Sequence, residues 1–150
     1  MDSKRQVVLI LSLLVLIEYV LGGFVTFDDP TNAGFSLASF SLSYPAVLPL
    51  IHRLFAVLLI LSWIVGSFYL KGTAAFRMSH MTIGLMFIQA FIGALIPATL
   101  SDGVLNAYVI IAHFSVSGLV IIGTGFTLYL GWFLKGHPAP STAHRLQETR

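Results

Sequence analysis

A histidine followed directly by an arginine, His52-Arg53, lies within an otherwise apolar stretch that reads LPLIHRLFAVLLILSWIVG. A second histidine, His113, lies in another apolar stretch, AHFSVSGLV, and a glutamate, Glu18, interrupts a third. Ionisable side chains are costly to place inside a lipid bilayer, so their presence in membrane segments usually marks a functional site. These four residues are therefore the first candidates for chemistry.

Two histidines on neighbouring helices can ligate a heme iron from both sides, because neutral imidazole is a strong ligand for iron. Ala56 and Ser117 each lie four residues after one of the histidines, on the same helical face, and their small side chains leave room for a flat macrocycle. A guanidinium such as that of Arg53 pairs well with a heme propionate. The pattern predicts that His52 and His113 bind heme iron and that Arg53 binds the carboxylate edge.

Simpler interpretations of the same residues stay open. An intramembrane histidine can form an interhelical hydrogen bond, and Arg53 can extend to the outer headgroups. Glu18 is either hydrogen-bonded to a neighbour such as Gln89 or catalytic, as a proton relay or a carboxylate that faces the cofactor. His80 lies at the cytoplasmic start of an apolar segment, where a polar residue costs little, and is interpreted as an interface residue.

Four apolar segments must position these residues, at 7–27, 45–70, 81–100 and 104–134. Each is long enough to provide the roughly 20 helical residues that cross a hydrocarbon core, and none alternates as strands do. The chain is 57% hydrophobic and 9% charged, whereas soluble domains are about 25% charged. The sequence predicts an all-α integral membrane protein: a four-transmembrane-helix bundle at 1–135, followed by a flexible cytoplasmic tail at 136–150.

Lysine and arginine flank these segments on one side, at Lys4, Arg5, Lys71, Arg77 and Lys135, whereas the other two loops contain aspartate and neither basic residue. The positive-inside rule then predicts cytoplasmic termini and a multi-pass protein of the plasma membrane. The basic excess reflects this orientation in the lipid bilayer and not nucleic-acid binding. The absence of cysteine excludes disulfides, thiolate metal sites and covalent c-type heme attachment.

The first and second halves of the sequence resemble each other. IEYVLGGFV at 17–25 aligns with IQAFIGALI at 88–96, and the second and fourth segments end in FYLKG and WFLKG. The alignment pairs Glu18 with Gln89, Gly22 with Gly93, and His52 with His113. We therefore expect two similar helical hairpins related by an axis along the membrane normal. That symmetry would bring the two histidines to face each other in the outer half of the bilayer.

With these motifs in order, the sequence resembles the heme A synthase family. The similar parts are the HR pair, the LGGFV that ends the first segment, QAFIGALIP in the third and AHFSVSGLV in the fourth, which together span about residues 7–134. The resemblance implies a b-type heme cofactor and heme O as substrate. Members of the family oxidise a ring methyl of heme O to a formyl group with oxygen and reducing equivalents, and so make heme A for terminal oxidases.

The common form of this family has eight helices in two similar halves, and this chain resembles one half alone, as in compact archaeal members. The resemblance implies that His52 and His113 are the heme ligands and Arg53 a propionate partner, and we count Gln89 with the cofactor-binding residues. The family glutamate three residues before the helix-two histidine is replaced here by Pro49, and the outer-loop cysteine pair is absent.

Because Pro49 stands at that position, Glu18 is the candidate for the catalytic role. One heme site per chain also implies a homo-oligomer, if cofactor and substrate hemes are separate. The leading hypothesis is a heme A synthase-like membrane oxidoreductase. The alternatives are a b-type cytochrome that carries electrons, a non-catalytic heme carrier or oxidase-assembly partner, and a helical scaffold without a cofactor.

Overall fold

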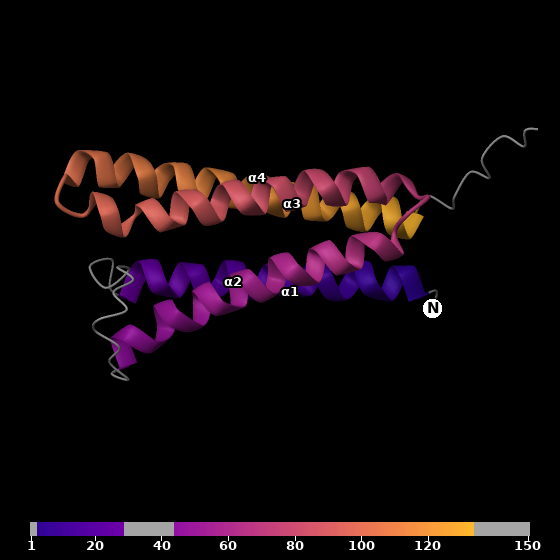
Figure 1. Cartoon of the computed structure of the whole chain (residues 1–150), viewed down its shortest axis with the longest axis horizontal. Helices are drawn as coiled ribbons and strands as arrows, with labels where there is room; N and C mark the ends of the chain where they lie inside the picture. The colour runs from indigo at the N-terminus through magenta and orange to yellow at the C-terminus, as the bar shows by residue number, and fades with distance from the viewer. Residues whose placement is uncertain (1–2, 29–43, 134–150) are drawn as a thin grey trace, which may run out of the picture.

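The structure is a computed structural model that describes residues 3–28 and 44–133 of the 150-residue chain. These residues form α1 (Ser3–Asp28), α2 (Tyr44–Tyr69), α3 (Ala74–Leu95) and α4 (Gly103–Phe133), with a short 3-10 helix, η3 (Pro97–Thr99), before α4. Successive long helices run in opposite directions (Figure 1). All 4 are long and apolar enough to cross a membrane, so the prediction of an all-helical multi-pass membrane protein is confirmed.

The third helix differs most from its predicted bounds of 81–100. It begins at Ala74, before the predicted start. The added first turns include the polar residues Arg77 and His80, which the apolar span did not cover. It ends at Leu95 because Pro97 lacks the backbone N–H that would continue an α-helix, and the chain tightens there into η3. The predicted cytoplasmic tail at 136–150 lies outside the described residues.

Polar side chains in the turn between α3 and α4 hold these two helices together. A carboxylate oxygen of Asp102 accepts hydrogen bonds of 3.1 and 3.0 Å from two backbone N–H groups in the first turn of α4, and so caps the helix. The Asn106 amide donates to the carbonyl of Ile96 at 2.8 Å and to the hydroxyl of Thr99 at 2.9 Å. This turn therefore has a defined geometry at its end of the bundle.

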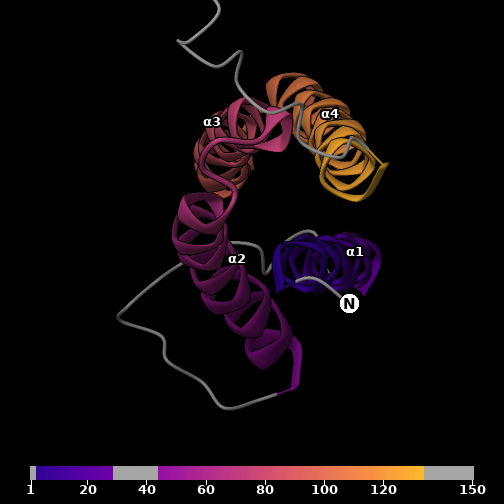
Figure 2. The ribbon, with the colours of Figure 1, turned by 90° about the vertical axis from the view of Figure 1, so that its right-hand side faces the viewer.

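Viewed end on, the four helices surround a common axis and each contacts two neighbours (Figure 2). The contacting pairs are α1 with α2, α2 with α3, α3 with α4, and α4 with α1. Among the described residues, the backbones of α2 and α4 do not approach each other closely, and neither do those of α1 and α3. The two helices that contain the candidate histidines, α2 and α4, are therefore diagonally opposed.

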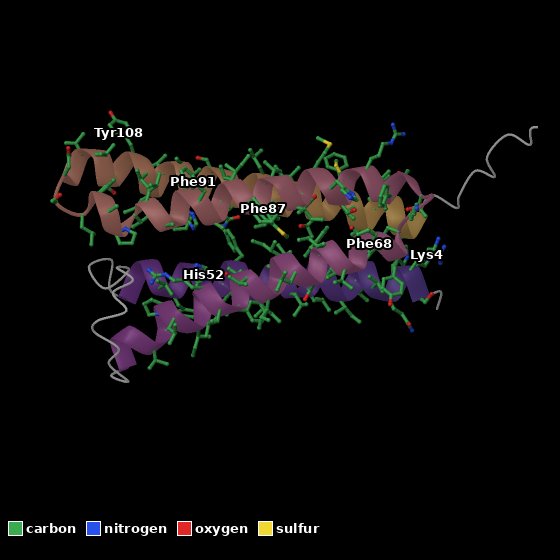
Figure 3. The ribbon with its side chains drawn as sticks, in the orientation of Figure 1. Lys4, His52, Phe68, Phe87, Phe91 and Tyr108 are labelled. Carbon is green, nitrogen blue, oxygen red and sulfur yellow. The ribbon has the colours of Figure 1, made fainter. Side chains whose placement is uncertain are left out.

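The core of the bundle is apolar, and so is its outer surface. Trp63 is fully buried at the centre of a cluster to which all four helices contribute. The cluster consists of Leu11, Val15, Leu59, Ile60, Trp63, Ile83, Met86 and Val120. Phe68, Phe91 and Tyr108 project outward (Figure 3) and are 65%, 67% and 67% exposed. Apolar side chains so widely exposed fit a lipid environment and not water.

Basic residues mark one end of the bundle. The start of α1, the turn between α2 and α3, and the end of α4 lie together at that end (Figure 1). Lys4, Arg5 and Lys71 belong to these segments. The Arg5 guanidinium carbon lies 5.7 Å from the ring centre of Trp132, a cation–π contact between the first and last helices.

Candidate functional site

A cavity of about 290 Å³ lies between the helices, and all four of them line it. Its size is near the lower limit of the roughly 300–1,000 Å³ that is usual for small-molecule sites. Most lining residues are apolar. The lining residues that can form hydrogen bonds through their side chains are Glu18, Tyr19, His52, Arg53, Gln89, His113 and Ser117. Every predicted site residue therefore lies at this one cavity, in the half of the bundle where Figure 3 places His52.

The imidazole of His52 on α2 contacts the carboxylate of Glu18 on α1. The His52 Nδ1 atom lies 2.8 Å from the Glu18 Oε1 atom. Glu18 is only 8% exposed, and neither of its oxygens, nor the His52 Nδ1 atom, has hydrogen-bond geometry with a partner among the described residues, so this is a close contact at ion-pair distance. If the Glu18 carboxylate is ionised it can only accept hydrogen, and Nδ1 is the His52 nitrogen that would then bear the hydrogen. The other ring nitrogen, Nε2, then has its lone pair available for a ligand.

His113 on α4 is oriented in a comparable way by α3. Its Nδ1 atom lies 3.1 Å from the backbone carbonyl oxygen of Gln89. A carbonyl oxygen can only accept, so Nδ1 donates the hydrogen and Nε2 of His113 retains a lone pair. A hydrogen bond from Nδ1 to an oxygen is the usual arrangement behind a metal-bound histidine, because it fixes the tautomer and the ring orientation.

A glycine packs against each of the two imidazole rings. A β-carbon added at Gly22 would lie 3.0 Å from Cε1 of His52, and one added at Gly93 would lie 2.9 Å from Cε1 of His113. Such distances are shorter than ordinary van der Waals contacts between carbon atoms. Glycine at both positions therefore allows the rings to lie directly against the backbones of α1 and α3.

The Gln89 side chain is bonded within the second helix pair. Its amide nitrogen donates to the Ser117 hydroxyl at 2.6 Å, and that hydroxyl donates to the His113 backbone carbonyl at 2.8 Å. The hydrogen bond between Glu18 and Gln89 that we weighed from the sequence is not formed, because each side chain has its partner on the adjacent helix of its own pair. Gln89 does line the cavity, as a cofactor-binding residue must.

The other residues considered from the sequence divide between the cavity and the surface. Arg53 is partly buried and lines the cavity beside His52. Pro49, which replaces the family glutamate, is buried within α2 and lines the same cavity. His80 is exposed on α3, and its Nδ1 lies 2.9 Å from the Phe76 carbonyl oxygen. It is not among the residues that line the cavity, and its interpretation as an interface residue stays a prediction.

Sequence reasoning missed the contact between Glu18 and His52 and the packing of glycine against imidazole. The available signal was the internal alignment, which places a glycine one helical turn after both Glu18 and Gln89. That alignment related the two helix pairs to each other. It said nothing of which side chains meet within a pair, since this depends on how α1 is rotated against α2.

Together, the fold and this site define a helical multi-pass membrane protein with a histidine-lined cavity inside its bundle. No known family model, curated protein or solved structure matches the chain. Among the described residues, no group of three or more histidine, aspartate and glutamate side chains is placed to hold a bare metal ion. A heme iron is different, because the porphyrin supplies four ligands and the protein supplies only the axial ones.

Proposed function

We propose that this protein is a heme-binding membrane oxidoreductase of the heme A synthase type, which oxidises a ring methyl of heme O to a formyl group. The observation that carries the proposal is the arrangement of His52 and His113. They come from diagonally opposed helices, line one cavity, and each presents Nδ1 to an oxygen acceptor. Two neutral imidazoles with their Nε2 atoms available form the donor set of a six-coordinate heme.

Three features of the cavity support heme as its ligand. The first is the apolar lining, which suits a porphyrin face. The second is Arg53, which lines the cavity beside His52 and can pair with a propionate. The third is the presence of glycine at positions 22 and 93, because a β-carbon at Gly22 or Gly93 would collide with the imidazole ring that packs there. A bound heme would supply the redox chemistry, while the protein positions it and excludes water.

The cavity lining also supports the proposal of two similar hairpins, α1–α2 and α3–α4. Positions that the internal alignment pairs line the cavity together. These pairs are Val15 with Met86, Glu18 with Gln89, Gly22 with Gly93, Pro49 with Ile110, His52 with His113, Arg53 with Phe114, and Ala56 with Ser117. A binding site shared evenly by two halves is common in membrane proteins built from repeats.

A b-type cytochrome that only transfers electrons is the second candidate function. Ligation by two histidines suits that role, and Pro49 occupies the position of the glutamate that the resemblance associates with catalysis. The Glu18 carboxylate lies at the cavity wall, where a catalytic group of a heme A synthase would be needed. It also contacts His52, as a residue that only orients a heme ligand of a cytochrome would. The heme A synthase hypothesis requires oxygen and an electron donor, whereas the cytochrome hypothesis requires only electron donors and acceptors.

Analysis of the bound heme distinguishes these candidates. We would express the wild type and His52→Ala in cells that supply heme O, extract the heme from purified protein and separate it by chromatography. Hydroxylated or formyl heme in the wild type, and its loss in His52→Ala, is the expected result. Unmodified heme in the wild type would favour the cytochrome or heme-carrier function. A wild type that contains no heme would contradict heme binding altogether.

The proposed setting is the plasma membrane, with both termini in the cytoplasm. The supporting observation is that Lys4, Arg5 and Lys71 belong to one end of the bundle, where the start of α1 and the turn between α2 and α3 meet (Figure 1). On this orientation the cavity lies in the outer half of the membrane. We further propose a homo-oligomer, since a chain with one such cavity needs a second copy if cofactor and substrate hemes bind separately.

A further inference from the structure

Part of the cavity wall is also part of the outer surface of the bundle. Among the described residues that line the cavity, those that are also exposed are Tyr19 on α1, Val57 on α2, and Ala90 and Ala94 on α3. The outer surface of a membrane-spanning bundle faces lipid, so these side chains stand between the cavity and the bilayer. All of them except Tyr19 belong to the side of the bundle where α2 and α3 are neighbours.

The interface between α2 and α3 is closed near the turn that joins them and is thin beyond it. Met86 of α3 and Ile60 of α2 belong to the same buried cluster. Ala90 and Ala94 follow Met86 on one face of α3, and Val57 precedes Ile60 by one turn of α2. The two helices separate in this direction (Figure 1 and Figure 2). The cavity wall therefore consists of small side chains where the helices diverge.

The corresponding side of the bundle, between α1 and α4, carries a large side chain instead. The internal alignment pairs Ala90 with Tyr19. Tyr19 lies about three turns after Val8 on the same face of α1. Val8 packs against α4, since a β-carbon added at Gly131 would lie 3.1 Å from its Cγ2 atom. A phenol ring thus occupies the position at which the α2–α3 side has only a methyl group.

Arg53 defines the chemistry of a ligand that passes the thin side. It lies one turn before Val57 on the same face of α2, and it lines the cavity. A guanidinium pairs with carboxylates through two parallel hydrogen bonds, and such pairing is strongest away from water. The remaining rim is apolar. The combination fits an amphipathic ligand that dissolves in the bilayer by its apolar body and bears a carboxylate at one edge.

We propose that the cavity exchanges its ligand directly with the bilayer through a lateral opening between α2 and α3. Its rim consists of Val57, Ala90 and Ala94, and Arg53 pairs with the carboxylate edge of the ligand there. Tyr19 closes the equivalent place between α1 and α4. The inference rests on the proposed function, since it takes heme, a flat apolar molecule with carboxylates on one edge, as the ligand.

Exchange of the two alignment-paired residues tests the opening. Hemin is added to phosphatidylcholine vesicles that contain the full-length apoprotein, and uptake is followed by absorbance. Release is followed by transfer to an excess of acceptor protein. Ala90→Tyr is expected to slow both uptake and release by about tenfold or more, within the one to three decades that association rates span among variants of one site. A narrower passage slows both directions, whereas loss of a binding contact speeds release.

Two further variants complete this set. Ala90→Tyr combined with Tyr19→Ala moves the small residue to the α1–α4 side, so faster uptake than in Ala90→Tyr alone is expected. Ala107→Tyr is the matched control, because Ala107 is exposed on α4 and is not among the residues that line the cavity. It should keep the wild-type rates of uptake and release.

A reversible crosslink tests the opening without depending on how a larger residue packs. The chain contains no cysteine, so Val57→Cys combined with Ala90→Cys introduces its only two thiols. A bismaleimide with a disulfide spacer joins them across the rim, and reductant cleaves the spacer. Uptake of hemin should be slow in the linked protein and should recover after reduction. Each single cysteine variant, treated in the same way, is the control.

The possible results separate the opening from the heme site. Wild-type rates in Ala90→Tyr or in the linked protein would overturn the lateral opening and leave the heme site standing. Slower uptake with faster release in Ala90→Tyr would make Ala90 a binding contact, which also overturns it. Failure of Tyr19→Ala to restore uptake would overturn the role given to Tyr19. A wild type that takes up no hemin would instead overturn the proposed function, and the inference with it.

Discussion

Gly93 of α3 lies against the imidazole of His113 so closely that an added β-carbon would be 2.9 Å from Cε1 and 3.2 Å from Nδ1. Gly22 has the same relationship to His52, with corresponding distances of 3.0 and 3.6 Å. The rings also differ in how freely they can move. His113 is bonded to the backbone of α3, whereas His52 contacts a side chain that can move with it.

Gly93→Ala is therefore expected to displace His113 and to weaken heme binding by roughly 10-fold or more, as loss of ligand orientation usually does. Gly22→Ala should have the same effect but a smaller one, because His52 and Glu18 can shift together. Heme content of the purified variants, measured from the optical spectrum, checks both. Gly23→Ala is the matched control, since a β-carbon there would meet nothing within 4 Å. Equal heme content in all three variants would contradict the close packing.

Much of the fold follows from the sequence because a bilayer restricts the available structures. Long apolar runs without alternation can only be helices there, so the four segments and their order were predictable. The ends of α3 were not, because hydropathy reports the apolar span and not the helix. The polar first turns around Arg77 are helical although they contribute little to the apolar signal.

The candidate site was predictable at the level of which residues gather, and not of which residues touch. The cost of polar groups in lipid singled out Glu18, His52, Arg53 and His113, and all four line one cavity. The contact between Glu18 and His52 depends on the rotation of α1 against α2. A pattern of single residues along each helix contains little information on that rotation, because large apolar side chains lie on the outer surface of the bundle as well as in its core.

Arg53→Gln is expected to accelerate heme dissociation by about tenfold or more, because a hydrogen bond between charged groups contributes about 1.5–3 kcal/mol. Arg53→Lys retains the charge without the planar donor pair, so its heme dissociation rate should lie between those of the wild type and Arg53→Gln. The rate can be measured by transfer of heme to an acceptor protein in excess. Arg77→Gln, an exposed substitution on α3, is the control. If Arg53→Gln and Arg77→Gln release heme at the same rate, Arg53 does not bind the propionates.

Gly123→Ala tests the packing of α3 against α4 away from the histidine-lined cavity. A β-carbon at Gly123 would lie 2.7 Å from the hydroxyl oxygen of Thr82, which is fully buried and donates to the Met78 carbonyl at 3.0 Å. Overpacking of this kind costs about 1–3 kcal/mol. We expect a lower thermal midpoint in detergent, whereas Gly125→Ala, with nothing within 4 Å, should leave it unchanged. A midpoint equal in both variants would show that the two helices separate easily.

The orientation in the membrane can be tested because the chain contains no cysteine. Ala74→Cys at the start of α3 and Ser101→Cys before α4 are both exposed and lie at opposite ends of α3. Lys4, Arg5 and Lys71 lie at the same end of the bundle as Ala74. By the positive-inside rule, this end should face the cytoplasm. A membrane-impermeant maleimide added to intact cells should therefore label Ser101→Cys, and should label Ala74→Cys only after the membrane is permeabilised. The reverse pattern would place the termini outside and move the histidine cavity to the cytoplasmic half of the bilayer.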